Sequence, residues 1–170
     1  KIIFSLEEQM RHDFSETVEL VNANFGTVFS ELFGGGHAEI SLTDPDNVLE
    51  SGIEIKAAPP GKVIKSLSLL SGGEKSMVAL TIYLAILLHR PTPFCMLDEV
   101  DAALDEANVQ KYATYLKRFS HNTQLMVITH RRGTIELCDV LYGVYMQEKG
   151  VSGLLRQEFS EEFLNEVENA

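Results

Sequence analysis

Two acidic residues, Asp98 and Glu99, directly follow an apolar run that begins at Phe94. An apolar run that ends in two acids fits a buried strand that delivers carboxylates to the carboxyl edge of a sheet, where ligands bind. In phosphoryl transfer, one carboxylate of such a pair helps to hold Mg²⁺ and the other orients the attacking water. Asp98 suits the first role and Glu99 the second. Without other motifs, an Asp-Glu pair after a strand is more often a helix start or a solvated turn.

A helix start that could bind an anion is predicted upstream of the acidic pair, at the beginning of the helical pattern of residues 71–89. A serine N-cap beside two glycines exposes backbone N–H groups at the positive end of the helix dipole. Taken alone, such a segment is more often a capped helix after a turn. The downstream acidic pair favours a nucleotide site instead. The residues are Ser71, Gly72, Gly73 and Glu74.

A second apolar run ends at Ile128 and is followed by Thr129 and His130. A histidine at the carboxyl edge of a strand can donate a hydrogen bond to a phosphate oxygen and so report which phosphates are present. An isolated histidine there would usually be a surface residue. The remaining histidines show no paired spacing that would indicate a metal site.

These residues must be positioned by alternating helices and strands. Apolar residues recur at steps of three or four over residues 3–32, which predicts one long helix or two in sequence. Its first part could be the base of a coiled coil or an ordinary amphipathic helix. Residues 38–42 and 53–57 alternate and are expected to pair antiparallel. The later pattern predicts helices at 71–89 and 106–119, strands at 94–97, 124–129 and 140–146, and a short helix before the last strand. Alternating strands and helices indicate an α/β fold with a mainly parallel sheet flanked by helices.

Composition narrows the class of protein. Fourteen Lys and Arg against 25 Asp and Glu give a net charge of −11, which repels a phosphate backbone, so this surface is not expected to hold nucleic acid by itself. Cys95 and Cys138 have no partner spacing and are expected to be reduced thiols. The chain has no apolar run long enough for a membrane span, and its first residues become charged too soon for a signal peptide. We therefore expect a cytoplasmic protein with no membrane partner.

Taken together, the motifs resemble those of the ABC-type ATPases. Ser71–Glu74 resembles their signature loop, residues 94–99 their Walker B strand and His130 their switch histidine. The segment that resembles the D-loop consists of Ala102, Ala103, Leu104 and Asp105. The sequence that flanks these motifs resembles the C-terminal head segment of bacterial SMC chromosome-condensation proteins. These flanking segments are residues 31–36, 42–45, 59–62 and 141–144.

The resemblance implies a fold and a division of labour. The fold would be the C-terminal lobe of an ABC-type ATPase head, with an N-terminal helix leading from a coiled coil. Residues 1–33 would be the coiled-coil base and docking helix, 34–158 the lobe, and 159–170 an acidic tail. Two heads would sandwich two ATP molecules. The signature loop would contact ATP held by the partner head, and Asp98 with Mg²⁺, Glu99 and His130 would serve the ATP of their own head.

The resemblance also implies partners. They are an N-terminal head segment of the same protein, a second SMC head in a homodimer, a kleisin subunit of the ScpA type and DNA bound through the full complex at the nucleoid. A P-loop needs Gly-x-x-x-x-Gly-Lys-Ser/Thr, and the chain has only Gly61-Lys62 followed by Val63. The chain alone is therefore expected to be inactive. The alternatives are a related coiled-coil ABC ATPase of DNA repair, a transporter subunit, or a kleisin-docking lobe with idle carboxylates.

Overall fold

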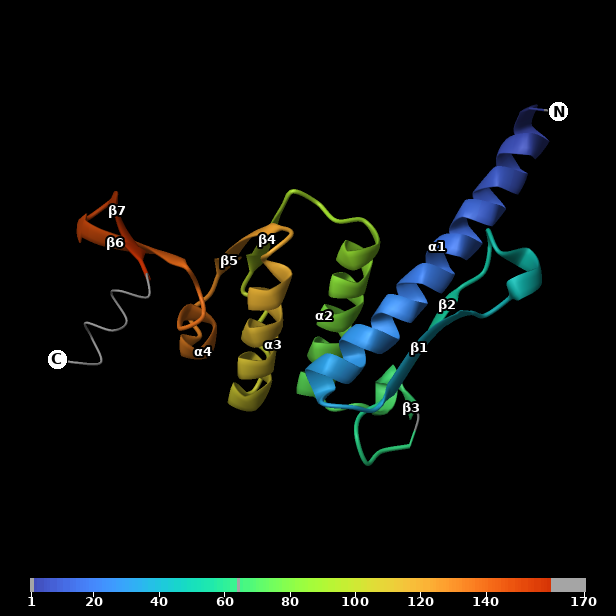
Figure 1. Ribbon diagram of the computed structural model, residues 1–170, viewed down its shortest axis with the longest axis horizontal. Helices are drawn as coiled ribbons and strands as arrows, with labels where there is room; N and C mark the ends of the chain where they lie inside the picture. Colours follow the sequence, from blue (N-terminus) through green and yellow to red (C-terminus); the bar gives the residue numbers. More distant parts are fainter. Residues whose placement is uncertain (1, 64, 160–170) are drawn as a thin grey trace.

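A computed structural model describes residues 2–63 and 65–159. Its elements lie in a row, with a long diagonal helix at one end and a two-stranded hairpin at the other (Figure 1). The first half contains α1 (Ile2–Phe33), β1 (His37–Leu42), the short 3-10 helix η1 (Pro45–Asn47), β2 (Ile53–Ala58), β3 (Lys65–Ser66) and η2 (Leu67–Leu69). The second half contains α2 (Gly72–His89), β4 (Phe94–Asp98), α3 (Glu106–Phe119), β5 (Gln124–Ile128), α4 (Arg132–Ile135), β6 (Val140–Glu148) and β7 (Val151–Glu158).

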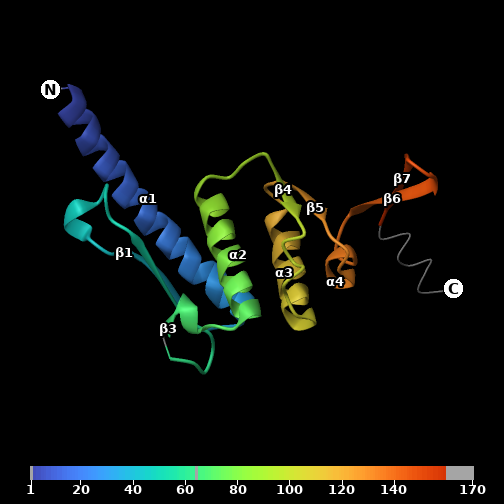
Figure 2. The same ribbon diagram turned by 180° about the vertical axis from the view of Figure 1, so that it is seen from behind.

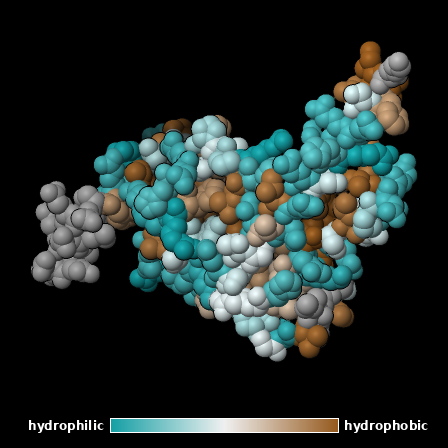
Figure 3. Space-filling model, turned by 45° about the vertical axis from the view of Figure 1, so that its right-hand side comes forward, coloured by the Kyte–Doolittle hydropathy of each residue, from teal (hydrophilic) through white to brown (hydrophobic). Residues whose placement is uncertain are grey.

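The predicted N-terminal helical pattern forms one continuous helix, α1. Its first turns are exposed, with Ile2 78% and Phe4 65% accessible, and they project beyond the body, where Figure 3 shows apolar surface at the protruding end. The helix becomes buried from Val21 onward. It stops before Gly36, whose φ is +90° and whose added Cβ would lie 2.4 Å from a carbonyl oxygen of β2, so only glycine fits there.

The predicted antiparallel pair is confirmed in β1 and β2, which pair with Ile40 opposite Ile55 and are extended by β3. This sheet packs against α1 and one face of α2. Their shared core includes Phe25, Phe29 and Val78. The alternation of side chains therefore places one face of the hairpin on the helices.

A second core lies on the other side of α2, between that helix, α1, α3 and the parallel strands. Met77, Leu84, Leu97 and Tyr112 are all nearly inaccessible there. Figures 1 and 2 show α2 between α1 and α3 in both views. The helix α2 therefore contributes to both cores, which joins the two halves of the chain.

The expectation of a mainly parallel sheet is wrong for the described residues. Their strands form three small sheets, and β4 with β5 is the parallel pair. The strand β6 pairs antiparallel with β7, a strand that the sequence pattern did not predict. A tight turn at Gly150, whose φ is +86°, brings the chain straight back, so β6 finds its neighbour in the next segment of the chain.

Three further expectations concern the acidic tail, the two cysteines and membrane-spanning helices. Phe159 is described, but residues 160–170 of the predicted acidic tail lie outside the described residues. Cys95 and Cys138 are both free thiols, as predicted. Within residues 2–63 and 65–159, no helix is long and apolar enough to cross a membrane.

Candidate functional site

The acidic pair lies at the carboxyl end of β4, as predicted, but the strand is buried on one face only. Cys95 and Leu97 point into the core, whereas the alternate positions are exposed. The backbone turns sharply at Glu99, whose φ of +48° is the only positive value of a non-glycine residue in the described chain. A non-glycine residue in this region costs about 1 kcal/mol or more and often marks a functional site. No local sequence signal indicated this conformation.

Parallel pairing brings the second predicted residue beside the acids. Asp98 lies opposite Ile128, and the amide of Glu99 donates to the Ile128 carbonyl oxygen at 2.9 Å. His130 Nδ1 consequently lies 3.8 Å from Glu99 Oε1. Both side chains are about two-thirds exposed, at 62% for Glu99 and 66% for His130, so they are open to a ligand. The strand ends thus form one site from residues far apart in the sequence.

The predicted anion-binding segment begins α2 with a complete capping box. Ser71 Oγ accepts from the amide of Glu74 at 3.3 Å, and the Glu74 carboxylate accepts from the amide of Ser71 at 3.0 Å. Gly72 and Gly73 are the first two helical residues, and helix geometry offers their amides no acceptor. The helix N-terminus therefore presents free donors at its positive end.

Lys62 is a member of this site that the sequence analysis missed. Its Nζ lies 2.6 Å from Glu74 Oε1. The hydrogen bond from Lys62, and then the one from the amide of Ser71, lower the pKa of Glu74 from 4.5 to about 2. The pattern Ser-x-x-Glu signals a capping box, but nothing in the local pattern indicates a lysine in the preceding loop.

The D-loop-like segment runs between the acids and α3. An added Cβ at Gly73 would meet the carbonyl oxygen of Ala103 at 3.8 Å, so this segment abuts the start of α2. An added Cβ at Gly72 would meet nothing within 4 Å, so that side is open. Ala102 and Ala103 are exposed, and Leu104 is buried. Asp105 caps α3 by accepting from the amide of Asn108 at 2.9 Å.

The residues fit part of a magnesium and nucleotide site. In the described part of the chain, no group of three His, Cys, Asp or Glu side chains could hold a metal by itself. Mg²⁺ usually takes one or two carboxylates and completes its shell with phosphates and water, a role that the exposed Asp98 can fill. The free amides at the start of α2 suit an anionic ligand. Neither feature replaces a P-loop.

One face of the β4 and β5 sheet carries apolar side chains that no described element covers. Their accessibilities are 65% for Phe94, 55% for Met96, 55% for Met126 and 48% for Ile128. The opposite face packs on the helices through Leu97 and Val127. A parallel sheet is normally covered on both faces, whereas the described helices cover only one face of this pair.

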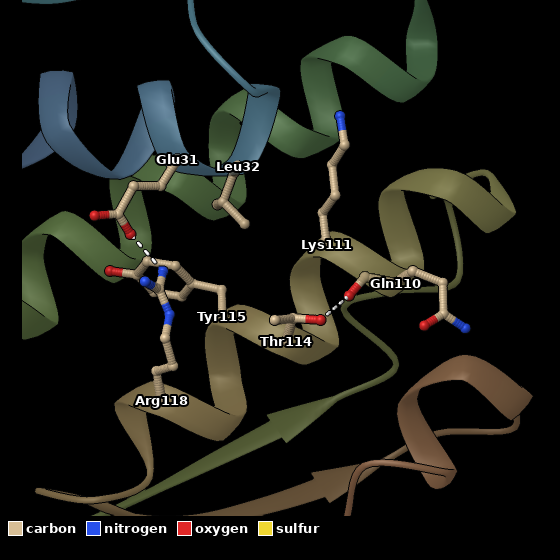
Figure 4. A pocket seen from close by; sticks show the side chains of 7 residues that line it. All are labelled: Glu31, Leu32, Gln110, Lys111, Thr114, Tyr115 and Arg118. Carbon is tan, nitrogen blue, oxygen red and sulfur yellow. Dashed lines mark hydrogen bonds and ion pairs between the residues drawn. The ribbon is translucent and has the colours of Figure 1, made fainter.

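A shallow pocket lies away from these residues, between α1 and α3 (Figure 4). Arg118 donates to Glu31 at 2.6 Å across it, and Lys111 donates to the Phe33 carbonyl oxygen at 3.4 Å. Its lining residues are Glu31, Leu32, Gln110, Lys111, Thr114, Tyr115 and Arg118. None of them belongs to the predicted site, and the contacts tie α1 to α3.

Comparison with known proteins gives the family. A family model described as RecF/RecN/SMC N terminal domain matches residues 3–153. The chain belongs to this family. It is 52% identical over 161 residues to the chromosome partition protein Smc of Bacillus subtilis, a match that covers 95% of the chain and 14% of that protein. It is 51% identical over 155 residues to the Smc of Desulfitobacterium hafniense, covering 91% of the chain and 13% of that protein.

Solved structures place this SMC segment in the head domain. An Smc head domain from Pyrococcus furiosus, bound to the C-terminal domain of ScpA, is 36% identical with a TM-score of 0.84, over 99% of this chain and 42% of that one. A chain from a study of ATP-driven dimerization of SMC ATPases is 36% identical with a TM-score of 0.81, over 94% of this chain and 95% of that one. The segment therefore has the α/β head fold of SMC ATPases with a long N-terminal helix, and it spans about one seventh of the length of its Smc relatives.

Proposed function

We propose that this chain is the C-terminal half of an SMC ATPase head, which binds and hydrolyses ATP together with an N-terminal P-loop segment and a second head. The observation that carries the proposal is the meeting of Glu99 and His130, 3.8 Å apart and exposed, at the carboxyl ends of β4 and β5. The absence of a P-loop from the sequence supports assignment to the half of the head that lacks it.

Within its own head, each residue of this edge has a separate task. Asp98 offers an exposed carboxylate to Mg²⁺, which neutralises developing charge on the phosphates when bound. Glu99 orients the attacking water with its carboxylate. His130 donates a hydrogen bond to a phosphate oxygen. The distance between Glu99 and His130 leaves room for them to act on adjacent atoms of one ligand.

The signature loop, Ser71–Glu74, serves the nucleotide of the other head in this proposal. The open side at Gly72 and the free first amides of α2 support this role, because a phosphate can approach them from outside the chain. Gly73 lies against Ala103, so the D-loop, residues Ala102–Asp105, stands at the same head-to-head surface. One chain would thereby contribute to two ATP sites.

The uncovered face of β4 and β5 supports the need for an N-terminal head segment. Full burial of an aliphatic or aromatic side chain stabilises by about 1.5–3 kcal/mol relative to exposure. Phe94, Met96, Met126 and Ile128 are each roughly half exposed, so covering them contributes about 4 kcal/mol. A segment carrying a P-loop would gain this free energy by completing the layers of the head.

Other partners follow from the relatives. The Pyrococcus furiosus head was solved with the C-terminal domain of ScpA, and we assign a kleisin site to the exposed hairpin β6–β7. Val144, Met146 and Leu154 are 62–74% accessible there. Through a homodimer of heads, the coiled coil that α1 enters, and a kleisin, the full protein would act on DNA in chromosome condensation and segregation at the cytoplasmic nucleoid.

A docking lobe without activity of its own is the second candidate. The exposed apolar hairpin favours it, since a kleisin could bind there whether or not ATP is turned over. The carboxylate of Glu99 and its neighbour His130 favour the ATPase, because a docking lobe would not require them at one edge. The ATP experiment distinguishes the two.

The test is ATP hydrolysis by the purified chain, alone and after addition of the P-loop segment. The chain alone should show no turnover, and the complemented head should hydrolyse ATP. Glu99→Gln in the complemented head should reduce kcat by about 100-fold or more while ATP still drives dimer formation, measured by sedimentation. Glu54→Gln, which changes a half-exposed carboxylate on β2, is the matched control. Normal turnover by Glu99→Gln would contradict the proposed role.

A further inference from the structure

Asp101 is a buried carboxylate between the acidic pair and the D-loop, and the proposed chemistry leaves it unused. Its side chain is 1% accessible. Its Oδ2 accepts from Thr129 Oγ1 at 2.7 Å and from Thr134 Oγ1 at 2.5 Å. Its Oδ1 is buried without a hydrogen-bond partner among the described residues. A buried carboxyl group is costly unless it is hydrogen-bonded, and the hydroxyls of Thr129 and Thr134 supply its side-chain hydrogen bonds among the described residues.

Thr129 holds the backbone on both sides of His130. Its hydroxyl donates to Asp101 and accepts from the amide of Arg131 at 2.9 Å. A side-chain oxygen that accepts from an amide two residues later closes a small turn around the residue between them. The direction in which His130 leaves the backbone is therefore set by the Thr129 hydroxyl and, through it, by Asp101.

Further bonds join the same two loops. Arg131 Nη2 donates to the carbonyl oxygen of Leu104 at 2.9 Å. The amide of Glu99 donates to the carbonyl oxygen of Ile128 at 2.9 Å. The segment from residue 99 to 104 is thus bonded to the segment from 128 to 134 at its start, middle and end. Glu99 and His130 themselves are exposed and touch only at 3.8 Å, so their own contact cannot hold them.

We propose that four residues form a positioning unit, the Asp101 bracket, which orients His130 and Glu99 toward the same ligand. They are Asp101, Thr129, Thr134 and Arg131. The bracket rests on the ATPase role proposed above, and it acts through other residues without touching the nucleotide. It also ties His130 to the D-loop through Leu104. A displacement of the D-loop by a second head would therefore be passed to His130 by bonded groups.

The test uses the full-length protein and one hydroxyl. Thr129→Val keeps the side-chain shape but removes the donor to Asp101 and the acceptor for the Arg131 amide. Loss of such a charge-assisted bond should lower kcat for ATP hydrolysis about tenfold, with KM changed less than about twofold, because the bracket does not bind ATP. Thr129→Ser restores the hydroxyl and should retain at least about half of kcat.

A matched control removes a buried hydroxyl elsewhere. Thr81 is inaccessible, and its hydroxyl donates to the Met77 carbonyl oxygen at 2.7 Å within α2. Thr81→Val should cost stability but leave kcat within about twofold of the unsubstituted protein. An equal loss of kcat in Thr81→Val would overturn the bracket, because the loss would then come from general destabilisation. An equal loss in Thr129→Ser would also overturn it, because the loss would then come from the missing methyl group and not from the hydroxyl.

A second readout does not depend on turnover. The amide of Arg131 should exchange slowly with deuterium in the unsubstituted protein and in Thr129→Ser, and about tenfold or more faster in Thr129→Val. Unchanged exchange at Arg131 would overturn the bracket. Absence of ATP turnover in the unsubstituted full-length protein would instead refute the proposed function, and the exchange measurement would still decide the bracket.

Discussion

Lys62 makes the clearest electrostatic prediction, because its hydrogen bond is the largest single cause of the lowered pKa of Glu74. Lys62 Nζ lies 2.6 Å from Glu74 Oε1, and its hydrogen bond is the largest cause of a fall in the Glu74 pKa from 4.5 to about 2. Lys62→Met keeps an apolar stem and removes the charge. The amide of Ser71 still donates to the carboxylate, so the pKa should rise only part of the way back toward 4.5.

The magnitude follows from this shift. A fall from 4.5 to about 2 corresponds to at most about 3 kcal/mol of folding free energy. The side chain of Lys62 is 51% accessible, so solvent screens much of the attraction. Part of the shift also survives in the bond from Ser71. We therefore expect Lys62→Met to lower the free energy of unfolding at pH 7 by about 1 kcal/mol.

The effect should depend on pH in a defined direction. The folded pKa of Glu74 is depressed, so its contribution is present in full above the unfolded value of 4.5 and is lost as pH falls from 4.5 to about 2. The difference in unfolding free energy between Lys62→Met and the unsubstituted protein should be constant near neutral pH. It should shrink steadily through this acid window.

Urea unfolding at pH 7 and at several values between pH 4.5 and 2 measures the difference in unfolding free energy. NMR titration of the Glu74 carboxyl measures its pKa in both proteins. Lys56→Met is the control, since Lys56 Nζ pairs with Glu54 at 3.0 Å on the surface of β2, where solvent screens the pair, and its loss should cost clearly less stability than the loss of Lys62. An unchanged Glu74 titration in Lys62→Met, or a stability difference that persists undiminished at pH 2, would refute the reasoning.

Two further predictions test the turn after α1 and the uncovered sheet face. Gly36→Ala should lower the free energy of unfolding by about 3 kcal/mol, because φ is +90° and the new Cβ would lie 2.4 Å from a carbonyl oxygen. Gly61→Ala is the control, since φ is +76° there but nothing lies within 4 Å of the new Cβ. It should cost about 1 kcal/mol in the same urea titration. Similar losses at both positions would contradict the steric argument. Met96→Lys should weaken binding of the P-loop segment by about tenfold or more in calorimetry, and Ile53→Lys, at a comparably exposed position on β2, should not. Equal affinities for the two variants would show that the segment does not cover Met96.

The helices and the first hairpin were predictable because their signals are local. The step of three or four in α1 and the capping residues Ser71 and Asp105 depend on neighbours within a turn or two of chain. The structure confirms these elements to within about two residues of the expected ends, as is usual for such boundaries. The order of strands and helices around the site was predictable for the same reason.

The pairing of the strands was not predictable from these patterns. The apolar run from Phe94 looks like a fully buried strand, yet the structure buries only alternate positions. Which neighbour a strand finds depends on long-range packing, and β6 pairs with β7 because the turn at Gly150 makes that partner nearest. The positive φ of Glu99 and the ion pair of Lys62 likewise leave no periodic signal.

The sequence by itself determined the kinds of groups present and their order along the chain: first a capped, glycine-rich helix start, then carboxylates after one strand and a histidine after the next, with no P-loop. Only the tertiary structure decided that Glu99 and His130 meet, and that Asp101 is buried beneath them with two threonine hydroxyls. The physical reason is range. Helix periodicity and caps act over a few residues, whereas parallel strand pairing and burial bring together residues about thirty positions apart, and their register follows from the packing of the whole domain.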